Sequence, residues 1–271
     1  MQNKIIYVYI ANELMFSLIS VTIISLLSLI GIFALSLKEE RLHKILFILL
    51  GFSGGVILGS ALLDLLPEAI EISRSSIEEL QTFIYITTGF VSFFILERFI
   101  YWYHGHGHSE EIEEECRRLN KREMKELVTL NVIGDAIHNF IDGMIISASY
   151  LTSIELGITT TIAVLFHELP QEIGDFGILI YSGIKAVKAL ILNLTSALTS
   201  FIGLLIIQIA YLNIENISLM IIPIACGGFI YLAASEIIPE LQKERNLKKA
   251  FIQLIFFQMG IIVIWLLNSL I

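Results

Sequence analysis

The sequence predicts an all-α integral membrane protein with eight transmembrane helices. Of its 271 residues 56% are hydrophobic and only 16% are charged, and the mean hydropathy is +0.80. These values lie outside the range of soluble globular domains. The apolar residues are also gathered into segments of about 20 residues, the length that a helix needs to cross a hydrocarbon core of about 30 Å. Residues 1–271 are therefore expected to form a single membrane domain.

The expected spans can be placed from the apolar segments. They cover residues 14–37, 44–66, 80–103, 127–149, 157–181, 187–211, 217–240 and 249–270. The first segment is interpreted as a span and not as a cleavable signal peptide, because its apolar run is longer than a typical signal core and no small-x-small cleavage site follows it.

Basic residues indicate how the spans are oriented. All but Lys4 and Arg74 of the 17 lysines and arginines lie in or next to the first, third, fifth and seventh loops. Lysine and arginine in short loops are retained on the cytoplasmic side. Both termini are therefore expected outside, with the loop 104–126 in the cytoplasm, in a multi-pass protein of the cell membrane.

The second and seventh spans contain a short internal repeat. Residues 54–69 read G-G-V-I-L-G-S-A-L-L-D-L-L-P-E-A and residues 227–241 read G-G-F-I-Y-L-A-A-S-E-I-I-P-E-L. Asp64 and Glu236 each stand three residues before a Pro-Glu pair. Because the two spans run in opposite directions, the repeat predicts an inverted arrangement of three, two and three helices, with the binding site at the central pair. Chance similarity between two glycine-rich apolar helices is the alternative.

The central pair of spans carries ionisable residues where hydrocarbon should tolerate none. Residues 131–144 read N-V-I-G-D-A-I-H-N-F-I-D-G-M, and residues 165–176 read L-F-H-E-L-P-Q-E-I-G-D-F. Ionisable groups at that depth cost several kcal/mol each unless something compensates them, so they indicate a functional site. A single membrane histidine usually makes an interhelical hydrogen bond, but two histidines, two amides and five acids on consecutive helices favour a divalent metal ion.

Helix geometry brings some of these side chains to one face. His138 and Asp142 are four residues apart and share a face, with Asp135 one turn earlier. Pro170 lacks the N–H that would bond residue 166, which loosens the next helix. Imidazole nitrogen with carboxylate and amide oxygen suits Zn²⁺, Fe²⁺ and Mn²⁺, and a set without thiolates favours a site that can release its metal.

Two segments resemble a known family. H-N-F-I-D-G (138–143) and H-E-L-P-Q-E-I-G-D-F (167–176) are similar to the fourth- and fifth-helix signatures of the ZIP (Zrt-, Irt-like protein) metal transporters, in the branch with a His-Glu-x-Pro-His-Glu-x-Gly-Asp motif. The resemblance implies uptake of divalent metal, zinc first and iron, manganese or cadmium as well, through a two-metal site. The ligands it implies are His138, Asn139, Asp142, His167, Glu168, Gln171 and Glu236. Gln171 stands where the branch usually has histidine.

The orientation of the spans places further acids along the pathway. Asp64 and Glu68 are expected toward the outside, where they would attract cations at an entrance; for Glu68 an interfacial acid is an equal alternative. Asp135, Glu172 and Asp175 are expected on the cytoplasmic side of the two histidines. They are interpreted as exit ligands.

The third loop contains a short histidine tract. His104, His106 and His108 alternate with glycine and precede the acidic run E-E-I-E-E-E. Flexible His-rich tracts often bind metal, and in this loop it would be metal that has already crossed. A solvated linker is the alternative reading.

Two other functions fit parts of the pattern. H-E-L-P-Q is similar to the H-E-x-x-H of zinc proteases, but Gln171 replaces the second histidine and a proline interrupts the motif. A proton-coupled or signalling membrane protein would leave the paired polar sets unexplained. No ATP-binding motif is found, and Cys116 and Cys226 are interpreted as bystanders. The sequence thus predicts a non-enzymatic protein that handles divalent metal within the bilayer, without organic cofactor or nucleic acid. The physiological metal, the coupling ion and a homodimeric state stay open.

Overall fold

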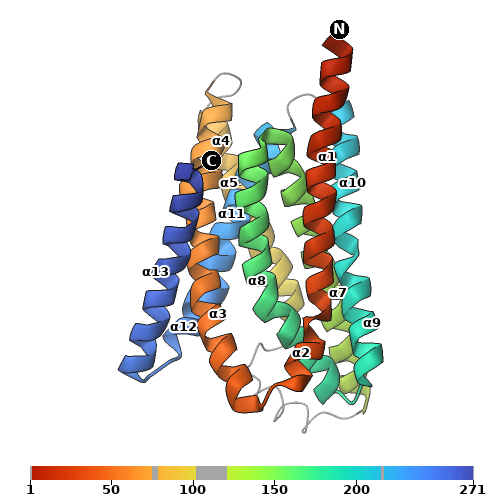
Figure 1. Cartoon of the computed structure of the whole chain (residues 1–271), viewed down its shortest axis with the longest axis vertical. Helices are drawn as coiled ribbons and strands as arrows, with labels where there is room; N and C mark the ends of the chain where they lie inside the picture. The colour runs from red at the N-terminus through yellow and green to blue at the C-terminus, as the bar shows by residue number, and fades with distance from the viewer. Residues whose placement is uncertain (1, 75–78, 102–120, 215–216, 271) are drawn as a thin grey trace.

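The chain forms a bundle of long helices (Figure 1). The computed structural model describes residues 2–74, 79–101, 121–214 and 217–270, and every regular element in these ranges is helical. Both ends of the chain lie toward the same end of the bundle, and the connections from α2 to α3 and from α12 to α13 lie at the other (Figure 1).

The helices follow one another with short connections. They are α1 (Gln2–Leu27), the 3₁₀ turn η1 (Ser28–Ile30), α2 (Gly31–Ser36), α3 (Glu39–Ser60), the π-helical turn η2 (Ala61–Leu65), α4 (Leu66–Ser73), α5 (Glu79–Tyr101), α7 (Lys121–Thr152), α8 (Ile154–Tyr181), α9 (Ala186–Ala197), α10 (Thr199–Asn213), α11 (Ser218–Tyr231), the π-helical turn η3 (Leu232–Ile237), α12 (Ile238–Gln242) and α13 (Leu247–Leu270).

Six helical segments in the described part of the chain are long and apolar enough to cross a membrane. They are Asn12–Ser36, Glu40–Ser73, Glu79–Arg98, Ala186–Asn213, Ser218–Gln242 and Leu247–Leu270. The predicted all-helical, multi-pass membrane protein is therefore confirmed. The predicted fourth and fifth spans coincide with α7 and α8, which have 32 and 28 residues but are made more polar by their ionisable side chains.

Glycines allow three pairs of helices to pack backbone against backbone. A Cβ atom on Gly55 of α3 would overlap the carbonyl oxygen of Phe257 on α13, and one on Gly227 of α11 would overlap that of Ile86 on α5. Gly143 of α7 lies in the same way against α10. Small residues let membrane helices approach closely enough for dispersion to hold them without a hydrophobic driving force.

The apolar core lies between the helices, and large apolar side chains also cover the outside. Ile146, Val164 and Phe229, from three different helices, are fully buried. Phe94 and Trp265 are about half exposed, as are many neighbours on α5, α10 and α13. Such an outer surface is suited to lipid and not to water.

The two π-helical turns have a local cause. Pro67 in the first turn of α4 lacks the N–H that would bond the carbonyl of Leu63, and that carbonyl instead accepts a hydrogen bond from Asn268 Nδ2 at 2.8 Å. The turn widens, and the N–H of Leu66 bonds five residues back. A proline also begins α12, after η3. Asp64 and Glu236 lie one in each π turn, a geometry often found at functional sites.

Candidate metal centre

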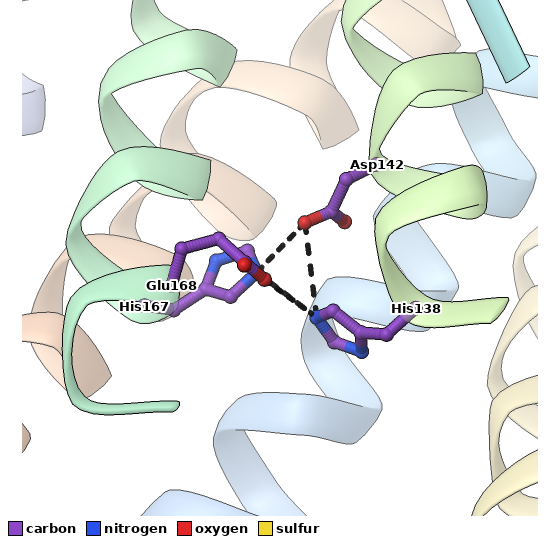
Figure 2. Close-up of side chains that lie close together, drawn as sticks. All are labelled: His138, Asp142, His167 and Glu168. Carbon is purple, nitrogen blue, oxygen red and sulfur yellow. Dashed lines mark hydrogen bonds and ion pairs between the residues drawn. The ribbon is translucent and has the colours of Figure 1, made fainter. Parts of the chain in front are cut away.

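Four metal-ligating side chains converge between α7 and α8 (Figure 2). His138 and Asp142 come from successive turns of α7, and His167 and Glu168 are consecutive on α8. Each offers one ligand atom, and these atoms lie within 4.8 Å of one another. The expectation that both histidines and these two acids lie together is met for this part of the set.

The distances in this group are those of ligands around an absent centre. His138 Nε2 lies 3.3 Å from His167 Nε2 and 3.2 Å from Glu168 Oε1. His167 Nε2 lies 3.2 Å from Asp142 Oδ2. The His138 side chain is 15% exposed, and the other three are 5% exposed or less. A cation here would be almost completely removed from solvent.

The tautomer of His167 is set by the backbone. Its Nδ1 lies 3.1 Å from the carbonyl oxygen of Ala163, and because a carbonyl only accepts, Nδ1 carries the proton. A neutral ring therefore presents the Nε2 lone pair. That lone pair faces the carboxylates of Asp142 and Glu168, which also accept. Only a proton or a metal ion can satisfy so many acceptors at once.

A second group of acids adjoins the first. Asp135, Glu168 and Glu172 also have carboxylate oxygens within 4.8 Å of one another, so Glu168 belongs to both groups. Both oxygens of Glu168 and Oε1 of Glu172 are buried and accept no hydrogen bond within the described part of the chain. Buried carboxylates without compensation are strongly unfavourable. The second group offers only oxygen.

Helix α9 contributes two polar residues that sequence reasoning missed. Asn193 Nδ2 donates to Glu172 Oε2 at 3.0 Å, and the hydroxyl of Ser196 donates to Asp135 Oδ2. Asn139 Nδ2 donates to the other oxygen of Asp135 at 2.7 Å. The only signal in the sequence was two polar residues three apart in an otherwise apolar span, which does not indicate their partners.

Comparisons with known proteins agree with this geometry. The sequence profile of the family described as ZIP zinc transporter matches residues 12–128 and 103–268. The chain belongs to the ZIP family. The resemblance seen in the two central helices is thereby confirmed over most of the chain.

Several ZIP relatives match this chain over long segments. Zinc transporter zipt-7.1 of Caenorhabditis briggsae is 29% identical over 276 residues, covering 82% of this chain and 70% of that protein. Zinc transporter YKE4 of Saccharomyces cerevisiae is 29% identical over 259 residues, covering 86% and 73%. Human zinc transporter ZIP4 is 39% identical over 137 residues, which are 51% of this chain but 21% of that larger ZIP protein.

The expected entrance acids of this ZIP chain lie away from the central groups. Asp64 is half-buried in η2 and accepts a hydrogen bond from Thr159 on α8. Glu68 is half-buried in α4. Thr159, which sequence reasoning also missed, thus links the turn that contains Asp64 to a helix of the central pair.

The remaining predicted residues are less completely described. Gln171 and Asp175 are half-buried on α8, and Asp175 belongs to neither of the two groups. Glu236 lies in η3, but its side chain is outside the described part of the structure, as are His104, His106 and His108. Cys226 is buried, and its thiol donates to the carbonyl of Ala61 at 3.4 Å.

Proposed function

We propose that the protein carries divalent transition metal, zinc above all, into the cytoplasm through two adjoining cation positions between α7 and α8. The observation that carries the proposal is the pair of buried groups that share Glu168. Lone pairs and negative charges converge there without enough hydrogen-bond donors. The relatives named as zinc transporters make zinc the first substrate to test.

The chemistry of the two groups differs. Two imidazole nitrogens with two carboxylates are the ligand set that borderline metals such as Zn²⁺ favour. The second group has carboxylates alone, which suit harder cations such as Mn²⁺ better. Neither group has a thiolate, so both can release what they bind. Asn139, Gln171 and Glu236 complete the proposed central ligand set.

The proposed path crosses an inverted bundle of eight spans with both termini outside. Metal enters past Asp64 and Glu68 and leaves past the exit acids Asp135, Glu172 and Asp175. Three observations support this arrangement. Basic residues gather in the odd-numbered loops, both halves have a π turn before a Pro-Glu pair, and the close packing of α3 on α13 resembles that of α11 on α5.

The zinc-protease alternative loses its basis in this geometry. An H-E-x-x-H motif would supply its second imidazole from residue 171, one turn along the same helix. Here the imidazole beside His167 comes from His138 on α7, at 3.3 Å. No enzymatic function is proposed.

Zinc uptake by the purified protein in liposomes tests the proposal. His138→Ala and His167→Ala should each lower initial Zn²⁺ uptake about 10-fold or more, since even indirect loss of support for a ligand costs about 10- to 100-fold in metal affinity. Fe²⁺, Mn²⁺, Cd²⁺ and Co²⁺ in competition would rank the substrates.

His43→Ala serves as the matched control, because it removes a histidine from α3, outside both groups. It should keep wild-type uptake. A folded His138→Ala, His167→Ala double variant that still transports zinc at the wild-type rate would refute the assignment of the site.

A further inference from the structure

Helix α9 reaches the acidic group with two side chains, and the geometry points to a role for them. We infer that Asn193 and Ser196 are positioning residues that hold Glu172 and Asp135 as an all-oxygen position for a second divalent cation. The inference rests on the proposed function and adds to it the residues that make the second position selective for a cation.

Ser196 completes the restraint of Asp135. One carboxylate oxygen accepts from Asn139 Nδ2 at 2.7 Å, and the other accepts from the Ser196 hydroxyl. Asp135 is 4% exposed and Ser196 2%. With a donor on each oxygen the carboxylate cannot rotate freely, so its position relative to Glu168 is maintained.

Asn193 restrains Glu172 differently. Its Nδ2 lies 3.0 Å from Oε2, and Oε1 of the same carboxylate is buried without a hydrogen bond among the described residues. The donor thus holds one oxygen and leaves the other available as a ligand. Glu168 adds two more buried oxygens that accept no hydrogen bond there. Two neutral donors from α9 do not balance three neighbouring carboxylates, whereas a divalent cation would supply the missing charge.

The junction after α9 ties it to the same part of α7. Thr199 Oγ1 at the start of α10 donates to the carbonyl of Ala136 at 2.5 Å. Asn193 and Ser196 are buried and three residues apart on one face, while Thr195 between them is exposed and bonds only its own helix, at Ile191. Helix α9 therefore has one face directed to the carboxylates and another directed away.

A calorimetric titration of the purified protein with Zn²⁺ alone tests this inference. Wild type should show two binding events, one for the histidine-containing group and one for the all-oxygen group. Asn193→Ala and Ser196→Ala should each weaken the second event about 10- to 100-fold, the usual effect of removing a residue that orients a ligand. The first event should keep its affinity, because its ligands do not contact α9.

Three further variants separate positioning from packing. Ser196→Thr keeps the hydroxyl and should restore the second event. Asn193→Leu has nearly the same volume without the donor, and it should weaken that event as alanine does even where alanine impairs folding. Thr195→Ala removes a hydroxyl from the other face of α9 and should change neither event.

Each other outcome is decisive. An unchanged second event in Asn193→Leu and Ser196→Ala, or equal weakening of both events, would overturn the positioning role. A single event in wild type would also overturn it while leaving the proposed transport function intact. Absence of any zinc binding in wild type would instead refute the proposed function.

Discussion

At the scale of single residues, the position next to Pro170 is where this chain departs from the branch that it resembles. Gln171 is half-buried on α8, one turn after His167 and beside Glu172 of the acidic group. An amide offers a neutral oxygen where imidazole would offer a nitrogen. Borderline metals such as Zn²⁺ gain more from nitrogen than the harder Mn²⁺ does, so this residue is expected to tune selectivity.

Gln171→His should tighten Zn²⁺ binding relative to Mn²⁺. Because conduction needs a site weak enough to release its ion, the maximal rate of zinc uptake should fall while half-saturation improves. Parallel Zn²⁺ and Mn²⁺ uptake curves in liposomes measure both quantities. If the ratio of the two metals and the maximal rate stay the same, residue 171 does not contact the transported ion.

At the scale of elements, glycine contacts determine how the helices are rotated against each other. Gly55 meets the backbone of α13 and Gly227 that of α5, so each half of the bundle has one such contact. Other glycines do not have this role. A Cβ on Gly177 of α8 would meet no atom within 4 Å.

Gly55→Ala should destabilise the protein, because its Cβ would overlap the carbonyl oxygen of Phe257 and the two helices must separate. Overpacking of this kind typically costs about 1–3 kcal/mol. Gly177→Ala is the matched control and should be neutral or stabilising by up to about 1 kcal/mol, since alanine is the better helix former. Thermal unfolding in detergent, followed by circular dichroism, compares them. Equal melting temperatures would show that the α3–α13 contact does not limit packing.

At the scale of the whole molecule, the ends of the helices fall into two sets. Both ends of the chain lie toward one end of the bundle, and the connection from α12 to α13 lies at the other (Figure 1). The basic residues Lys243, Arg245, Lys248 and Lys249 are in or next to that connection. The positive-inside rule therefore assigns it to the cytoplasm.

Single cysteines report this orientation in a background with Cys116→Ser and Cys226→Ala. Glu155→Cys and Leu270→Cys should react with a membrane-impermeant thiol reagent on intact cells, because both positions are exposed at the end assigned to the outside. Leu247→Cys, which is 87% exposed at the start of α13, should react only after permeabilisation. The opposite pattern would invert the proposed direction of transport.

The sequence by itself determined the class of the protein and the location of its unusual chemistry. Bilayer thickness imposes long apolar helices, and such segments are visible without any tertiary information. His138, Asp142, His167 and Glu168 could be singled out because ionisable residues in apolar segments are costly, and helix periodicity put the first two on one face. The prolines that follow Asp64 and Glu236 were also visible, although not the π turns that they cause.

Only the tertiary structure decided which atoms meet. That Glu168 joins both groups, that the amide of Asn139 turns to Asp135, and that Ser196 reaches the same carboxylate depend on how α7, α8 and α9 are rotated about their axes. Those rotations are set by packing contacts between segments far apart in sequence, such as Gly143 against α10. Periodicity within one helix says which residues share a face, but it contains no information on which neighbour that face will meet.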